Sequence, residues 1–276
     1  MSLVHNPVEH TVLPHNAVPS ATWSSAGRAY DEISRGIADA IEHCINRLEP
    51  EADDRILDVA TGTGWTARRL ADRGYDVTAV DFAPEVVTAG RKLAMLRGLD
   101  IAFQDGDAEA LPFQDGFFDA VISTFGVMFA QRPEDAAKEL ARVCRPGGRL
   151  ALATWTPDGN VFEMFKVMKA FLPAPAGSPP PSPFEWGNPE RVSELLAKDF
   201  ELTFETGTSY YREPDGLSAW DTFSTGYGPL RTLAAKLDET TREQLKRKFI
   251  AFHAGFATEL GICVPRDYLI VRGIRL

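Results

Sequence analysis

The stretch from Arg55 to Ala67 constrains the fold of this chain more than any other; it reads Arg-Ile-Leu-Asp-Val-Ala-Thr-Gly-Thr-Gly-Trp-Thr-Ala. Its apolar first half predicts a buried parallel strand, and the residues after Gly64 predict the start of a helix. Gly62 and Gly64 permit positive φ angles and let a ligand approach the backbone closely. The free N–H groups at a helix start then point at that ligand. A strand, a tight turn and a helix start in this order predict a cofactor-binding turn.

Short apolar runs and helical patterns alternate along the residues that follow. The expected strands cover residues 55–60, 75–80, 101–105, 117–123 and 149–155, and the expected helices cover residues 67–73, 85–97 and 133–144. Strands that alternate with helices of this length indicate βαβ units with right-handed crossovers. We therefore predict an α/β fold, with a Rossmann-like, doubly wound and mostly parallel sheet.

The pattern divides the chain into three parts. These are a flexible N-terminal arm (residues 1–23), a core that begins with an amphipathic helix (residues 24–156), and a C-terminal part with the remaining strands and a helical substrate cap (residues 157–276). Isoleucines at every fourth position from 33 to 45 are typical of such a helix. The cap is expected in two insertions, at about residues 157–199 and 213–262.

Composition and charge exclude several classes of protein. Up to Trp155 the chain has 15 Lys and Arg against 23 Asp and Glu, so its core half would repel a phosphate backbone and nucleic acid is not expected as a partner. No apolar run approaches the ~20 residues that cross a bilayer, so stable membrane insertion is not expected. Cys44, Cys144 and Cys263 lie far apart and form no metal-ligand pattern. We expect no metal site, a cytoplasmic location and a monomer or homodimer.

Two cofactors are compatible with the turn taken alone. Gly62, Gly64 and Ala67 match the G-x-G-x-x-A form of the dinucleotide motif, and Asp81 ends the next strand, where an acidic residue hydrogen-bonds the ribose of NAD. Asp58 is harder to reconcile with NAD, because it places a carboxylate inside a strand that is otherwise apolar. An unpaired buried carboxylate is costly, which favours a functional role for it.

Five segments between Arg55 and Trp155 carry motifs in a defined order and spacing. They are Leu57–Gly64, Val80–Pro84, Gly106–Phe113, Phe118–Phe125 and Leu140–Leu150. Together they resemble the motifs of class I S-adenosylmethionine-dependent methyltransferases, of the ubiquinone/menaquinone-biosynthesis type (methyltransferase type 11). The resemblance implies a seven-stranded sheet with a C-terminal antiparallel strand, S-adenosylmethionine as methyl donor and S-adenosylhomocysteine as product.

The resemblance also implies where the methionine part of the cofactor lies. Asp58 is implied to lie below it, where it orders the turn and counters the amino group. The two turn glycines are implied to leave room for the methionine and ribose, and Ser123 to offer its backbone carbonyl to the ammonium. The residues implied around this part are Asp58, Ala60, Thr61, Gly62, Gly64 and Ser123.

The adenosine part is implied to bind residues that follow the second and third strands. Asp81 accepts both ribose hydroxyls, Phe82 packs on the adenine, Asp107 accepts from its amino group and Ala108 offers a backbone N–H to the ring. Tyr30 is a candidate lid over the cofactor. As alternatives, Asp81 and Asp107 act only as helix caps, and Phe82 belongs to the core.

Methyl transfer from a sulfonium is an in-line displacement, and the protein chiefly places the nucleophile about 3 Å from the methyl in a water-poor pocket. A general base is needed only for a nucleophile that is protonated at neutral pH, and the sequence identifies no catalytic residue. His253, in a Phe-rich helical stretch, is interpreted as a half-buried structural histidine. No Asn-Pro-Pro-Tyr-like segment stands at residues 123–130, which argues against methylation of DNA bases or glutamine side chains.

Aromatic side chains are frequent in the segments expected around the acceptor. They include Trp23, Trp155, Trp186, Trp220, Phe162, Phe165, Phe171, Phe184 and Tyr227. We predict a small apolar or aromatic acceptor, with the alternative that these residues form the ordinary core of the cap. Two other functions stay open: a non-catalytic S-adenosylmethionine-binding regulatory or partner protein, and, least favoured, an NAD(P)-dependent oxidoreductase.

Overall fold

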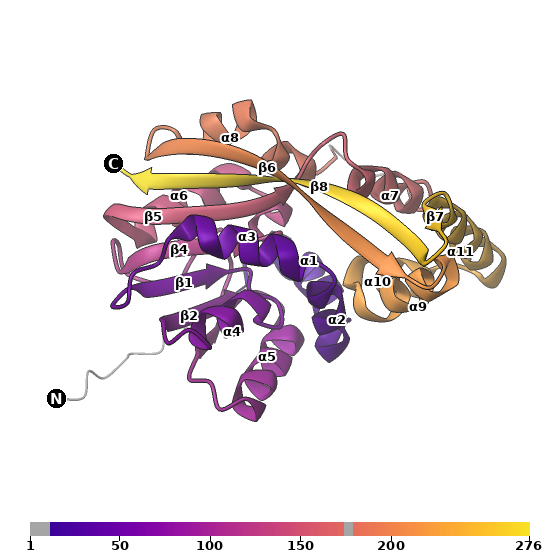
Figure 1. Cartoon of the computed structure of the whole chain (residues 1–276), viewed down its shortest axis with the longest axis horizontal. Coiled ribbons are helices and arrows are strands. Elements are labelled where there is room, and N and C mark those ends of the chain that lie inside the picture. The colour runs from indigo at the N-terminus through magenta and orange to yellow at the C-terminus, as the bar shows by residue number, and fades with distance from the viewer. Residues whose placement is uncertain (1–11, 174–178) are drawn as a thin grey trace.

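The computed structural model describes residues 12–173 and 179–276 (Figure 1). In these residues seven strands form one sheet in the order β3-β2-β1-β4-β5-β8-β6, and a short eighth strand, β7, pairs with β8. The strands are β1 (Arg55–Val59), β2 (Asp76–Asp81), β3 (Ala102–Asp105), β4 (Phe118–Thr124), β5 (Cys144–Trp155), β6 (Phe200–Glu213), β7 (Ala257–Thr258) and β8 (Gly261–Arg275). Strands β1 to β5 are parallel, and β8 runs antiparallel to both β5 and β6. The predicted fold class is confirmed.

Helices cover both faces of the sheet: α3 crosses the near face in Figure 1, and α6 lies behind it. The α-helices are α1 (Ala17–Ser24), α2 (Tyr30–Arg35), α3 (Ala38–Leu48), α4 (Trp65–Ala71), α5 (Pro84–Leu96), α6 (Pro133–Val143), α7 (Asn160–Lys169), α8 (Pro189–Leu196), α9 (Gly216–Gly226), α10 (Gly228–Lys236) and α11 (Glu239–Ala254). Helix α3 buries Ile41, Ile45 and Leu48, and each such side chain contributes roughly 1.5–3 kcal/mol to folding.

The N-terminal region differs from its prediction. The single helix expected at the start of the core is divided into a 3₁₀ turn, η2 (Gly27–Ala29), and the helices α2 and α3, because the chain turns at Gly27 and again at Gly36, and glycine is a poor helix former. Residues 14–23, expected to be part of a flexible arm, form a 3₁₀ turn, η1 (Pro14–Asn16), and most of α1. The rest of that predicted arm, residues 1–11, lies outside the described residues.

Strands β6 and β8 are longer than the sheet that they complete. The pairing of β5 with β8 stops at Trp155 opposite Tyr268, whereas β6 and β8 stay paired as far as Glu213 opposite Ile262. The extra length forms a two-stranded ribbon that reaches towards α9, α10 and α11 (Figure 1). Strand β8 begins at Gly261, so the ribbon includes residues well before the part that pairs with β5. This ribbon brings the predicted cap to the carboxyl ends of the parallel strands.

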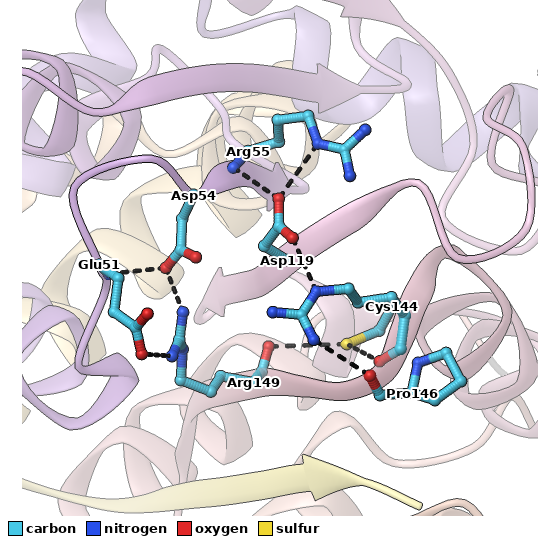
Figure 2. A network of polar contacts seen from close by, with 8 residues as sticks. Glu51, Asp54, Arg55, Asp119, Cys144, Pro146 and Arg149 are labelled. Atoms are coloured by element: carbon cyan, nitrogen blue, oxygen red, sulfur yellow. Dashed lines mark hydrogen bonds and ion pairs between the residues drawn. The ribbon is translucent and has the colours of Figure 1, made fainter.

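The opposite, amino-terminal edge of the sheet is joined by ion pairs (Figure 2). Asp119, near the start of β4, accepts from the backbone N and Nε of Arg55 at 3.0 and 3.1 Å, and from Nε of Arg145 at 2.7 Å. Arg149 pairs with Asp54 and Glu51 beside them. Asp119 therefore ties the starts of β1, β4 and β5 together.

The Asp119→Asn variant is expected to unfold more easily, by about 1–3 kcal/mol at pH 7. Burial raises the pKa of Asp119, but hydrogen bonds from Arg145 and Arg55 outweigh it and bring the pKa to about 2. A carboxyl with a lowered folded-state pKa stabilises the fold above its unfolded pKa of about 3.9, and the effect is lost as the pH falls towards 2. Urea unfolding at pH 7, 4 and 3 measures this decline. The control is Asp115→Asn, because Asp115 is 83% exposed in its pair with Arg142 and is expected to contribute little; equal losses in both variants would contradict the assignment.

Candidate functional site

A cavity opens where β1, β2 and β4 end, with an empty volume of about 640 Å³ that includes its open mouth. Strand β1 is flanked by β2 on one side and β4 on the other, so the direction of the strand order reverses there. In open α/β sheets, ligands bind in the crevice outside the carboxyl ends of the strands at this reversal. Seven of the predicted cofactor residues line the cavity: Tyr30, Ala60, Gly62, Asp81, Phe82, Asp107 and Ala108.

The other four predicted residues, Asp58, Thr61, Gly64 and Ser123, lie behind the cavity wall. Ser123 Oγ donates to the carbonyl of Val59 at 2.7 Å and accepts from the N–H of Val127, so its side chain links β1 to the turn after β4. At Gly64 a Cβ would lie 2.6 Å from the ring of Phe103, so the glycine allows close packing of that ring. The contacts of these four residues hold the strand ends and turns that surround the cavity.

Asp58 joins the turn to the helix that follows it. Its Oδ2 accepts from Thr61 Oγ1 at 2.5 Å and from the N–H of Ala67, in α4, at 3.1 Å. Its Oδ1 is buried and has no partner among the described residues. Burial raises the pKa of Asp58 to about 7, against the lowering effect of the two hydrogen bonds. A cationic group near Oδ1 would offset the free-energy cost of burying this charge and would favour the ionised carboxylate.

The backbone is strained on both sides of the cavity floor. Ala60, after β1, has φ 55°, and Phe125, after β4, has φ 56°. Left-handed angles at residues other than glycine cost about 1–3 kcal/mol and cluster at functional sites. Gly126 directly follows Phe125, and a Cβ at Gly126 would lie 2.5 Å from the Cβ of Ala60. The ends of β1 and β4 are thus held in close contact where they face the cavity.

Asp81, at the end of β2, faces the cavity with both oxygens partly occupied. Its Oδ2 accepts from the N–H of Gly62 at 2.8 Å and its Oδ1 from the N–H of Ala83 at 2.9 Å. A carboxylate has about four acceptor positions, so about two remain for a ligand. Burial raises the pKa of Asp81 to about 6, against these hydrogen bonds. The geometry suits a ligand that presents two neighbouring hydroxyls.

The ring of Tyr30 packs directly on the glycine turn. Gly62 has φ 58°, and a Cβ there would lie 2.7 Å from Cε1 of Tyr30. Burial, and then the charge of Asp81, raise the pKa of Tyr30, so its hydroxyl stays protonated at neutral pH. Tyr30 therefore closes one side of the cavity next to the turn.

The N-terminal segment contributes to the site in a way that the sequence reasoning missed. Both oxygens of Asp107 accept from Asn16 Nδ2, at 3.2 and 2.9 Å, and Oδ2 also accepts from the N–H of Leu13. Oδ1 accepts in addition from the N–H of Glu109. His15 Nε2 lies 2.6 Å from Glu109 Oε2. These contacts hold residues 13–16 against the site. The sequence feature that could have predicted a short helix here is Pro14, because proline favours the first position of a helix.

A second, aromatic cavity adjoins the first and shares Trp23, Tyr30, Phe125 and Phe129 with it. Its other lining residues are Ile33, Ile37, Trp155, Val161, Met164, Phe165, Phe223, Tyr227 and Arg266. Of the aromatic residues expected around the acceptor, Trp23, Trp155, Phe165 and Tyr227 line this cavity. Trp186, Trp220 and Phe184 do not line it and belong to the hydrophobic core, which also includes Trp155 and Tyr227.

The remaining candidates lie away from both cavities. His253 is buried more fully than expected; its Nδ1 lies 2.9 Å from the carbonyl of Phe249, and burial lowers its pKa. Across residues 12–173 and 179–276, no three His, Cys, Asp or Glu residues are grouped to hold a metal ion. Over the same ranges, no helix is long and apolar enough to cross a membrane.

Comparison with known proteins matches this chain to a methyltransferase family. The model of a family described as "Methyltransferase domain" matches residues 57–152. An uncharacterized protein of Mycobacterium tuberculosis is 34% identical over 209 residues, which cover 74% of this chain and 76% of that protein. A second uncharacterized protein of the same species is 43% identical over 144 residues, 52% of each, so the chain spans about half the length of such curated relatives.

Two further matches concern named methyltransferases. The demethylmenaquinone methyltransferase of Thermus thermophilus is 47% identical over 109 residues, 39% of this chain and 50% of that enzyme. A putative methyltransferase from Bacillus halodurans superposes with a TM-score of 0.58 at 18% identity, over 85% of this chain and 97% of its own. At that identity the superposition supports the fold.

Proposed function

Because this chain belongs to the class I S-adenosylmethionine-dependent methyltransferases, we propose that it transfers a methyl group from S-adenosylmethionine to a small apolar or aromatic acceptor. The proposal rests on the pair of adjoining cavities. One is edged by Asp81 with about two open acceptor positions, and the other is lined by aromatic and aliphatic side chains and by Arg266. The first suits a ribose with its adenine, and the second suits an apolar acceptor.

In the proposed arrangement the adenosine lies along the ends of β2 and β3. Asp81 accepts the two ribose hydroxyls, which are charge-assisted hydrogen bonds. Phe82 covers the adenine. Asp107 already accepts four hydrogen bonds, from Leu13, Asn16 and Glu109, so one of them has to give way for Asp107 to accept from the adenine amino group. The N–H of Ala108 serves a ring nitrogen. In this pose Asn16, which already binds Asp107, holds the N-terminal segment over the adenine.

The methionine part then extends over Ala60 and Gly62 towards the end of β4. Asp58, with its unpartnered Oδ1 beneath the turn, supplies negative charge for the ammonium, through water if the two groups do not meet directly. The aromatic residues that the two cavities share would lie between the cofactor and the acceptor. When bound, S-adenosylmethionine supplies the electrophilic methyl group.

The protein's own contribution is to orient the acceptor and exclude water. The second cavity is lined by rings and aliphatic side chains, and the described residues that line it include no carboxylate and no imidazole. Its two tyrosines, Tyr30 and Tyr227, stay protonated because burial raises the pKa of each. Rate enhancement by proximity and orientation therefore suits this site better than general-base catalysis.

The proposal is tested with S-adenosylmethionine that carries a labelled methyl group and a panel of phenolic, quinol, amine and carboxylic acid acceptors. Transfer to at least one small acceptor is expected, with none to peptides or nucleic acids. Binding of S-adenosylhomocysteine without turnover across the panel would favour the alternative of a non-catalytic binding protein. The name of the Thermus thermophilus relative, a demethylmenaquinone methyltransferase, is a reason to include ring-containing apolar acceptors.

Cofactor binding is expected to release protons between pH 6 and 7. Burial raises the pKa of Asp58 to about 7 and that of Asp81 to about 6, so both carboxyls are partly protonated in the free protein. A bound ammonium and bound ribose hydroxyls favour the ionised forms, which lowers both pKa values and makes affinity increase as pH rises. Calorimetry of S-adenosylhomocysteine at pH 6.5, in buffers of different ionisation enthalpy, counts the protons. Asp81→Asn is expected to release fewer; proton uptake by the wild-type protein would contradict both roles.

A further inference from the structure

Arg266 occupies an inward position of the β6–β8 ribbon that its neighbours fill with apolar or aromatic side chains. Side chains alternate between the two faces of a strand, and along β8 Ile262, Val264, Arg266 and Tyr268 are all buried. Arg266 is paired with Ser209 beyond the last residue of β5, where the ribbon leaves the sheet. Its position places a cation at the side of the aromatic cavity.

The guanidinium group of Arg266 is buried with most of its donors unused. The residue is only 7% exposed, and Nη2 donates to the carbonyl of Gly36. Nε is buried without a partner among the described residues. The rings of Trp155 and Tyr211 lie 5.6 and 4.8 Å from the guanidinium carbon. These contacts fix the plane of the group and leave several N–H donors free.

No carboxylate neutralises this charge within the part of the chain that the structure describes. Asp39 is near enough to influence it, but Asp39 Oδ1 already accepts from the N–H of Ala40 at 2.8 Å and from Ser209 Oγ at 2.7 Å. Burial lowers the pKa of Arg266 to about 10, so the group is still charged at neutral pH. Burying a charge without a partner costs several kcal/mol, and a bound anion would offset that cost.

We propose that Arg266 binds a carboxylate of the methyl acceptor, and that the acceptor is a flat aromatic acid. The other residues that line the cavity are apolar or aromatic, so a single negative charge balances the site, as a carboxylate does and a phosphate dianion does not. The guanidinium fork matches a planar carboxylate with two parallel hydrogen bonds. Trp23, Tyr30, Phe125 and Phe129 line both cavities, whereas Arg266 lines only the second. The acceptor atom therefore lies at the end of the ring system away from its carboxylate.

This inference deepens the proposed function and rests on it. The probes are 2-naphthoate and its neutral counterpart 2-naphthamide, titrated into protein saturated with S-adenosylhomocysteine. The wild-type protein is expected to bind naphthoate at least tenfold more tightly than naphthamide. Arg266→Met is expected to abolish this preference, and Arg266→Lys, which keeps the charge but loses the fork, to retain part of it. The matched control is Arg272→Met, because Arg272 lies on the same strand and pairs with Glu49 at the surface.

Melting temperature separates binding from a structural role. A binding role predicts that Arg266→Met melts at the same or a higher temperature, since it removes an unpaired buried charge. It also predicts unchanged affinity for S-adenosylhomocysteine and for naphthamide. If both Arg266 variants fail to fold, the naphthoate-to-naphthamide ratio of the wild-type protein decides alone. Equal binding of the two probes, binding of neither, or an unchanged preference in Arg266→Met would overturn the inference. Absence of S-adenosylhomocysteine binding would instead count against the proposed function.

Discussion

The Asp81→Ala variant is expected to bind S-adenosylhomocysteine at least tenfold more weakly than the wild-type protein. The proposed contacts are two charge-assisted hydrogen bonds from the ribose, and the loss of even one such bond costs about 1.5 kcal/mol or more, which is roughly a factor of ten in affinity. The change also frees the N–H groups of Gly62 and Ala83, which Asp81 now holds at 2.8 and 2.9 Å. The turn is then less well ordered, which adds to the loss.

The matched control is Asp76→Ala, because Asp76 is the exposed first residue of the same strand. This control is expected to leave the affinity for S-adenosylhomocysteine unchanged within twofold. Calorimetric titration of the three proteins, with melting temperatures to verify folding, makes the comparison. Equal affinities of Asp81→Ala and the wild-type protein would remove the ribose assignment.

Replacement of Gly62 by alanine is expected to weaken cofactor binding by tenfold or more. At φ 58° a Cβ at this position would lie 2.7 Å from Cε1 and 3.2 Å from Cδ1 of Tyr30, so the ring has to move. Tyr30 lines both cavities, and its displacement alters the space for the methionine part and for the acceptor. The left-handed backbone adds a strain of about 1–2 kcal/mol.

Gly74→Ala provides the control for strain alone. Gly74 has φ 88°, and a Cβ there meets no atom within 4 Å. Both variants are expected to lose about 1–2 kcal/mol of unfolding free energy from the left-handed backbone, but only Gly62→Ala is expected to lose affinity for S-adenosylhomocysteine. Similar affinities in the two variants would show that the contact between Tyr30 and the turn does not govern cofactor binding.

The sheet was predictable from sequence because its signals are local. The apolar run before Gly62 and the acidic residue at the end of β2 are each visible in a short stretch of neighbouring residues, and the alternation of strands and helices is a succession of such stretches. Seven of the eleven predicted cofactor residues line one cavity, which follows from strand ends that meet at one edge. Their roles towards the cofactor stay predictions.

The contributions that sequence reasoning missed depend on contacts between distant segments. Asn16 meets Asp107 across 91 residues, and nothing near Asn16 indicates a buried carboxylate as its partner. Arg266 alternates with Ile262, Val264 and Tyr268 along β8, and its inward position depends on pairing with the distant strand β6. The alternation of Ile262, Val264, Arg266 and Tyr268 is the sequence pattern that indicates a charged residue on a buried face.

We infer that the cavity at the ends of β1, β2 and β4 binds S-adenosylmethionine and not a dinucleotide. Calorimetric titration of the wild-type protein with S-adenosylhomocysteine, NAD and NADP at pH 7.5 tests it most directly. The account predicts one S-adenosylhomocysteine site per chain, weakened at least tenfold by Asp81→Ala, and no heat of binding from either dinucleotide. Saturable binding of NAD or NADP, with none of S-adenosylhomocysteine, would contradict it.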